Sequence, residues 1–159
     1  MPTIIKVCDE ELQAIFDSML ENRVGPTFDE FLGLTVESPD MDTGIITFQM
    51  RDALIGNPTY RTIQGGVIST VLDMVGGHVV FVNAFKQVKG KSMAKQMQKL
   101  SKVGTIDLRV DYLQPGRGES FIATARILRS GNKVAVTRME LRNEKQDLIA
   151  VGTGTYTVG

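Results

Sequence analysis

The sequence predicts an α+β domain in which an antiparallel sheet of about six strands wraps around one long central helix. The first observation is the segment 67–85, which is apolar on nearly every side and must therefore be enclosed. The second is a run of four strand signals over residues 104–158. The third is the order of the elements, which does not alternate as in a doubly wound parallel sheet. The 159 residues are expected to form a single domain, 1–159.

The N-terminal element is predicted to be an amphipathic helix over residues 9–23, with Asp9 as its N-cap. Its apolar residues recur at helical spacing: Leu12, Ile15, Phe16, Met19 and Leu20. Two strands are predicted next, over residues 32–38 and 43–51. Residues 52–63 have the composition of turns.

The predicted central helix begins near Gly65, and a short helix is possible within residues 86–102. The strand predicted over 104–113 alternates cleanly, so one face should carry Ile106, Leu108, Val110 and Tyr112. Strands over 119–129 and 133–142 flank a tight hairpin turn, and a last strand covers 147–158. This order favours a sheet curled around a single helix.

Composition excludes several classes of protein. The 18 basic and 18 acidic residues cancel, which argues against a nucleic-acid partner. One cysteine and one histidine, Cys8 and His78, can form neither a disulfide within the chain nor a zinc site, so no metal or cofactor is expected. Acids at 9–11 argue against a secretory signal, and Asp73 argues against a membrane span. A cytoplasmic location is therefore expected.

The zero net charge conceals a strong asymmetry along the chain. Residues 1–52 contain eleven acids and three bases, whereas residues 86–102 contain six lysines and no acid. The lysine-rich segment could attract an anionic ligand, although such runs more often form a solvated face. Met93 and Met97 in the same segment could line an apolar tunnel or simply pack in the core.

The most informative stretch for chemistry is QGGVISTVLD, residues 64–73. Gly65 and Gly66 open the central helix, where free backbone N–H groups and the helix dipole can polarise a carbonyl or hold an anion. Asp73 interrupts the apolar run, and an enclosed carboxylate is costly unless it is paired. Asp73 is therefore a candidate base or nucleophile, although a purely structural role in a subunit contact is the alternative.

The spacing of these two features has a geometric consequence. Gly65 and Asp73 are eight residues apart, which is about 12 Å along a helix. One helix cannot place both groups at the same carbonyl carbon. If they cooperate, the protein is a homodimer with two central helices side by side and oppositely directed, which creates two composite sites.

Three motifs together resemble a known family: the Gly-Gly pair with Asp73, the strand ending in DYLQP at 111–115, and the hairpin SGNK at 130–133. They are similar to the PaaI-type acyl-CoA thioesterases of the hotdog superfamily, and most similar to its YigI-type bacterial group. The resemblance covers about residue 30 to the C-terminus. It implies hydrolysis of medium- to long-chain acyl-CoA to fatty acid and CoA, in fatty acid metabolism, by a homodimer or homotetramer.

The resemblance also implies roles for particular residues. Asp73 would be the catalytic carboxylate, acting as nucleophile or as general base for water. The backbone N–H of Gly65 would polarise the thioester carbonyl, Asn57 would contact the carbonyl or water, and Thr105 would orient water. Contacts to the CoA substrate are implied for Gly66, Arg129, Asn132 and Lys133.

The sequence departs from the family at Gln64, where a histidine is usual. A glutamine amide can hydrogen-bond and brace the loop, but it cannot titrate near pH 7. This substitution motivates the alternative of a non-catalytic acyl-CoA or lipid-binding hotdog protein. A role as an interaction scaffold is the weakest reading, because it leaves Asp73 unexplained. The only histidine, His78, is expected to be a core or interface residue.

Overall fold

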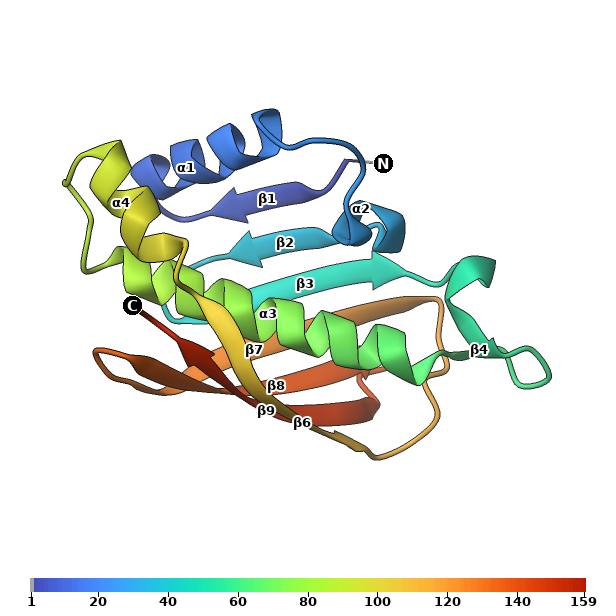
Figure 1. Cartoon of the computed structure of the whole chain (residues 1–159). Coiled ribbons are helices and arrows are strands. Elements are labelled where there is room, and N and C mark those ends of the chain that lie inside the picture. The colour runs from blue at the N-terminus through green and yellow to red at the C-terminus, as the bar shows by residue number, and fades with distance from the viewer. Residues whose placement is uncertain (1) are drawn as a thin grey trace.

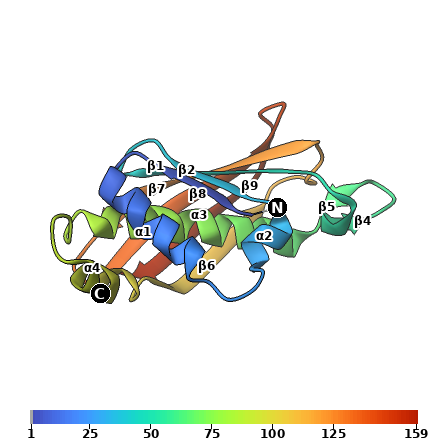
Figure 2. The ribbon, with the colours of Figure 1, turned by 90° about the horizontal axis from the view of Figure 1, so that it is seen from above.

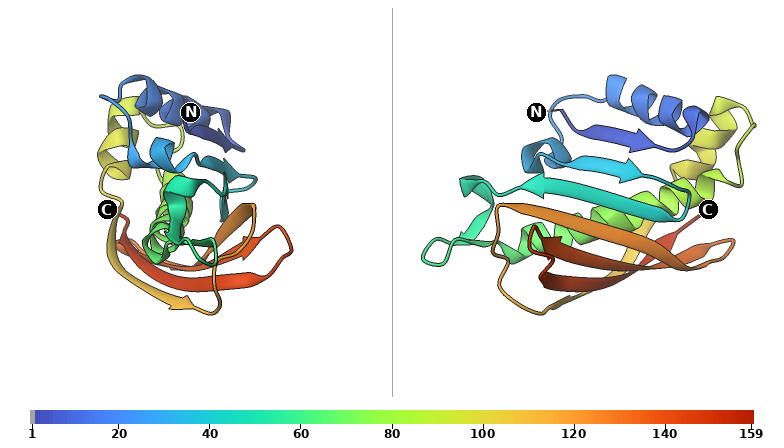
Figure 3. Two further views of the ribbon diagram at one scale, coloured as in Figure 1. Left: turned by 90° about the vertical axis from the view of Figure 1, so that its right-hand side faces the viewer. Right: turned by 180° about the vertical axis from the view of Figure 1, so that it is seen from behind.

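The computed structural model describes residues 2–159 (Figure 1). Within them, one sheet of seven strands curves around a long helix, α3 (Gly65–Phe85), as the end-on view in Figure 3 shows. In spatial order the strands are β1 (Ile4–Val7), β2 (Thr35–Ser38), β3 (Thr43–Gln49), β7 (Ser120–Ser130), β8 (Val134–Asn143), β9 (Leu148–Thr157) and β6 (Gly104–Tyr112). This arrangement is the hotdog fold, so the predicted α+β class is confirmed.

The sheet has one strand more than the six expected from the sequence. The extra strand is β1, which pairs in parallel with β2, whereas every other neighbouring pair in the sheet is antiparallel. Its four residues, IIKV, are too short to show an alternating pattern. Parallel pairing is possible because the long connection through α1 (Glu10–Glu21) returns the chain to the same end of the sheet.

The N-terminal helix agrees with the prediction, but the strand predicted over 32–38 begins too early. The Asp9 carboxylate accepts hydrogen bonds from the first turn of α1, as expected of an N-cap. Residues Phe28–Leu32 form a second short helix, α2, which Thr27 and Glu30 open as a capping box. Gly33 ends it in the left-handed region at φ 69°, so β2 begins only at Thr35.

The central helix α3 begins and ends where the sequence predicts. Its length and hydropathy would suit a membrane span, yet Val71, Leu72, Val75 and Val79 have no exposed surface because they pack against the sheet. Burial of each such side chain contributes about 1.5–3 kcal/mol. It is therefore the core helix of the fold. The predicted turn segment before it contains a 3₁₀ turn, η1 (Asp52–Leu54), and a small hairpin of β4 (Ile55–Asn57) and β5 (Thr62–Ile63).

A second hydrophobic cluster closes the C-terminal end of α3. It joins α1, the end of α3 and the helix α4 (Met93–Leu100), which lie together in Figure 2. Met97 packs against this cluster, while Met93 is 48% exposed. The predicted short helix within 86–102 is thus confirmed, and the core role of Met97 is favoured over a tunnel lining.

Candidate active site

The carboxylate of Asp73 is held by two hydroxyl groups. Thr105 donates from Oγ1 to Asp73 Oδ1 at 2.8 Å. The hydroxyl of Tyr156 lies 3.2 Å from the same oxygen and 3.1 Å from the backbone carbonyl oxygen of Asp73. No hydrogen bond to Asp73 Oδ2 is present within residues 2–159. One carboxylate oxygen is therefore anchored while the other is available to a reactant.

Thr105 reaches Asp73 because the edge strand β6 contains a bulge. Thr105 pairs with Tyr156 and Asp107 with Thr155, so Ile106 is an extra residue without its own partner. The alternation predicted for this strand is therefore wrong at Ile106, which is 54% exposed. On the helix side, Thr105 takes the place that an unbroken alternation would have given to Ile106.

Tyr156 is the part of this site that sequence reasoning missed. Its ring packs onto α3 at Gly76, where an added Cβ would stand 2.9 Å from the ring carbon Cζ, and it covers Gly154 on its own strand. Gly76 therefore allows a close approach of the helix to the sheet. The buried Gly154, two residues before the tyrosine on the same strand, was the available signal, because it leaves room for the large ring.

The protonation state of Tyr156 suits a hydrogen-bond donor. Burial, reinforced by the negative charge of Asp73, raises the pKa of its hydroxyl well above the usual value. The phenol therefore stays protonated over the whole physiological pH range. It can donate to Asp73 but cannot act as a base there.

Asp73 and Thr105 lie at the wall of a largely apolar cavity of about 440 Å³. This volume falls within the usual range of small-molecule sites. The cavity extends between α3, the N-terminal helix α1 and the segment that joins α4 to β6. Its apolar lining includes Phe16, Met19, Met74, Phe81, Leu100 and Val103. The arrangement places a carboxylate beside a space suited to an apolar chain.

His78 also lines this cavity, and the centroid of its ring lies 5.4 Å from the centroid of the Phe16 ring. Its Nε2 atom lies 2.7 Å from the hydroxyl of the buried Ser38. Burial lowers the pKa of His78 to about 4, so the ring is neutral at physiological pH. It thus behaves as the expected core histidine, with one edge on the cavity.

The start of α3 is built by Gln64. Its side-chain Oε1 accepts a hydrogen bond from Val67 N–H at 3.1 Å, so this glutamine is the N-cap of the helix. The carbonyl of Gly65 accepts from the hydroxyl of Tyr112 at 2.9 Å. A side chain at Gly66 would collide with Gln64, because its Cβ would lie 2.6 Å from Oε1. None of these residues lines the Asp73 cavity of the same chain.

The remaining candidate residues also lie apart from Asp73. Asn57 is exposed on β4, and its side-chain oxygen accepts from Thr59 N–H at 3.0 Å. The tip of the β7–β8 hairpin carries the exposed residues Arg129, Asn132 and Lys133. One chain therefore brings together Asp73 and Thr105, but not the other predicted site residues. No group of three His, Cys, Asp or Glu side chains in residues 2–159 could hold a metal ion.

Comparison with known proteins agrees with this architecture. Residues 60–150 match the model of the thioesterase superfamily. The medium/long-chain acyl-CoA thioesterase YigI of Escherichia coli is 44% identical over 132 residues, which cover 83% of this chain and 85% of that protein.

Solved structures give the same result. A Shewanella oneidensis protein related to the thioesterase superfamily superposes with a TM-score of 0.83 at 40% identity, and 95% of this chain and 99% of that one are covered. A thioesterase from Haemophilus influenzae shares the fold at 18% identity, with a TM-score of 0.68 and coverage of 89% and 86%. Sequence and fold together show that the chain belongs to the thioesterase superfamily.

Proposed function

We propose that this protein is an acyl-CoA thioesterase that converts medium- to long-chain acyl-CoA and water into a free fatty acid and CoA. The observation that carries the proposal is the Asp73 carboxylate, held through one oxygen and bordering an apolar cavity of about 440 Å³. The acyl chain would occupy this cavity. The preference for medium and long chains is taken from the relative that is 44% identical.

In the proposed reaction, Asp73 Oδ2 removes a proton from water as the water oxygen attacks the thioester carbon, or it attacks that carbon itself. The hydrogen bonds from Thr105 and Tyr156 keep the carboxylate in one orientation. With Asp73 as base, the C–S bond then breaks and the proton held by Asp73 passes to the CoA thiolate. With Asp73 as nucleophile, loss of the CoA thiolate leaves an acyl–aspartyl anhydride, which water cleaves to the fatty acid and the free carboxylate while a proton of that water goes to the thiolate. Thr105 would thus orient the Asp73 carboxylate, in addition to the water molecule that the family resemblance expects it to orient.

The carbonyl oxygen needs hydrogen-bond donors that the same chain does not bring to Asp73. We propose that they come from the start of α3 in a second copy, chiefly the backbone N–H of Gly65 of the partner subunit, braced by its Gln64 cap. The first turns of α3 leave room for such a partner, because Gly66, Ser69 and Asp73, which follow one another at helical spacing, retain exposed surface. Asn57 of the partner would lie near the same carbonyl.

The rest of the substrate would extend outside the cavity. Gly66 would leave the approach to the carbonyl open, and the hairpin residues Arg129, Asn132 and Lys133 would contact the CoA nucleotide. A pairing of two dimers into a tetramer is the further expectation. The cytoplasm is the proposed location, which suits a chain whose one cysteine, Cys8, is exposed and free.

The test is release of free thiol from a series of acyl-CoAs by the purified protein and by its Asp73→Asn variant. The carboxamide preserves the shape of the side chain but is neither a base nor a nucleophile, so turnover should fall by at least roughly 100-fold. Light scattering should show the same oligomer for both proteins. Turnover by Asp73→Asn at the native rate would remove Asp73 from the mechanism.

The same assay separates an enzyme from a binding protein. Gln64 caps α3 without any proton transfer, so Gln64→His should change turnover little if the protein is an efficient thioesterase. Binding of acyl-CoA without thiol release, together with activity gained in Gln64→His, would favour the non-catalytic hotdog protein.

A further inference from the structure

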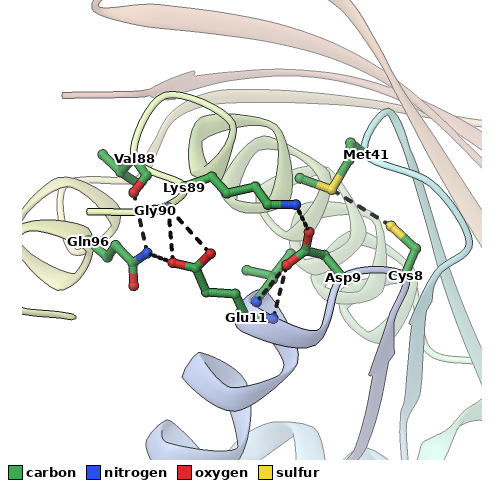
Figure 4. A network of polar contacts seen from close by, with 9 residues as sticks. Cys8, Asp9, Glu11, Met41, Val88, Lys89, Gly90 and Gln96 are labelled. Carbon is green, nitrogen blue, oxygen red and sulfur yellow. Dashed lines mark hydrogen bonds and ion pairs between the residues drawn. The ribbon is translucent and has the colours of Figure 1, made fainter. Parts of the chain in front are cut away.

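The six lysines of residues 86–102 fall into two groups in the structure. Two of them are neutralised by acids from the N-terminal part of the chain: Lys86 pairs with Asp42 at 2.6 Å, and Lys89 pairs with Asp9. Figure 4 shows the second pair beside the hydrogen bonds that tie the following loop to α1. These two lysines therefore have a structural explanation.

The other four lysines gather around a depression of about 320 Å³ on the outer side of α4. Its lining contains Lys91, Lys95, Lys99 and Lys102, together with Val88 and Gln98. None of the four forms an ion pair within residues 2–159, although Lys99 lies beside Gly159. We call this group the lysine pocket.

The lysine pocket brings like charges close together. Lys95 and Lys99 are four residues apart on α4, and like charges at this spacing destabilise a helix. A concave site with four cations and no acid concentrates positive potential. The most favourable occupant is a small polyanion with phosphate groups, for which lysine is a common partner.

The lysine pocket shares a wall with the apolar cavity beside Asp73. Leu100 and Val103 face the cavity beside Asp73, whereas Lys99 and Lys102 face the lysine pocket on the other side of the same segment. A substrate with an apolar tail and a phosphate-bearing end on a flexible arm could thus occupy both. An acidic protein surface would be a poorer match, because the positive charges line a depression of small-molecule size.

We propose that the lysine pocket binds the phosphate groups of the adenosine 3′,5′-bisphosphate portion of acyl-CoA. This inference rests on the proposed thioesterase function, and it adds a nucleotide site on α4 to the contacts expected at the β7–β8 hairpin. The occupied pocket would relieve the repulsion among the four ammonium groups. It would affect the capture of substrate and leave the chemistry at Asp73 unchanged.

The experiment compares Lys95→Gln, Lys102→Gln and the double variant with a matched control, Lys145→Gln, which removes an exposed charge outside the pocket. Each single change should raise KM for acyl-CoA roughly threefold to fivefold without changing kcat. Activity on the corresponding acyl-pantetheine, which lacks the nucleotide, should be the same in all proteins. Unchanged KM in the double variant would overturn the proposal.

Calorimetry with adenosine 3′,5′-bisphosphate tests the site independently of catalysis. The wild type and Lys145→Gln should bind it, and the double variant should bind it at least roughly tenfold more weakly. This result would support the nucleotide site even if no thioester were hydrolysed. Equal affinity of the wild type for inorganic pyrophosphate would show a general anion site. A rise in the KM of the double variant that occurs only with acyl carrier protein thioesters would show an acidic protein partner. Either outcome would overturn the assignment to CoA.

Discussion

Replacement of His78 by glutamine should remove most of the pH dependence of stability between pH 7 and pH 5. Burial lowers the pKa of His78 from 6.5 to about 4 in the folded protein. Between these two pH values the unfolded chain binds a proton at His78 that the folded protein does not bind. Stability is therefore greatest above pH 6.5 and falls as the pH drops toward 4. His78 is the only histidine of the chain, which makes this window unusually simple to interpret.

The size of the effect follows from the two pKa values. Each pH unit between them costs about 1.4 kcal/mol of unfolding free energy, because one more proton binds to the unfolded state. Acidification from pH 7 to pH 5 should thus cost about 2 kcal/mol in the wild type. Carboxylates contribute mainly at lower pH. The pKa of Asp9 is lowered by its hydrogen bond from Lys89, and that of Asp40 by the backbone N–H of Asp42, so their stabilisation is lost only as the pH falls below about 4.

Urea unfolding at a series of pH values, for the wild type and His78→Gln, measures this difference directly. The glutamine amide can still hydrogen-bond to Ser38, so the variant should fold and show a nearly flat profile above pH 5. The wild-type slope should persist at high salt, because it arises from burial and not from screened surface charges. An equal slope in both proteins would refute the assignment of this titration to His78.

Two further substitutions test how the Asp73 carboxylate is held, and two glycine substitutions test how the Tyr156 ring is packed. Thr105→Val removes the donor at 2.8 Å and should lower kcat roughly tenfold in the thiol-release assay, with little change in KM. Tyr156→Phe keeps the ring but removes the longer hydrogen bond, and kcat should fall roughly fivefold; an undiminished kcat would show that the phenol does not position Asp73. Gly76→Ala places a methyl group against the Tyr156 ring and should lower the free energy of unfolding in urea by about 1–3 kcal/mol. Gly77→Ala is the control, because its added methyl would lie 3.6 Å from the nearest carbon of the Tyr156 ring and should leave the free energy of unfolding almost unchanged.

The elements with strong local signals could be predicted from the sequence. The apolar run of α3 and the alternating strands of the C-terminal half gave the fold class, and the capping role of Asp9 set the start of α1. Elements that depend on tertiary contacts or on weak sequence patterns could not be predicted. The strand Ile4–Val7 exists only through its pairing with β2, and the helix Phe28–Leu32 has only five residues, the last of which was assigned to the following strand.

The candidate site was predictable in part for a similar reason. Asp73 stands out because a carboxylate is conspicuous in an apolar helix, and the family motif added Thr105. Tyr156 could not be connected to them, because its contact with Asp73 spans 83 positions of sequence and depends on the sheet register. The positions of Gly65, Asn57 and the hairpin relative to Asp73 depend on a second copy of the chain in the proposed dimer. They remain predictions that an oligomer structure would test.

The extra residue at position 106 means that the pairing of β6 with β9, and not only the identity of its residues, decides whether Thr105 can contact Asp73. If Ile106 were instead paired within a regular ladder, either Thr105 or all the residues after it would turn to the opposite face, whereas deletion of Ile106 would leave Thr105 and Leu108 on their present faces. A chain with such a regular ladder through Ile106 and with Thr105 turned away would keep Asp73 and Thr105 in its sequence but lose the contact between them. When relatives of this protein are aligned, a one-residue gap at Ile106 is therefore compatible with the same contact, because it removes only the unpaired bulge residue.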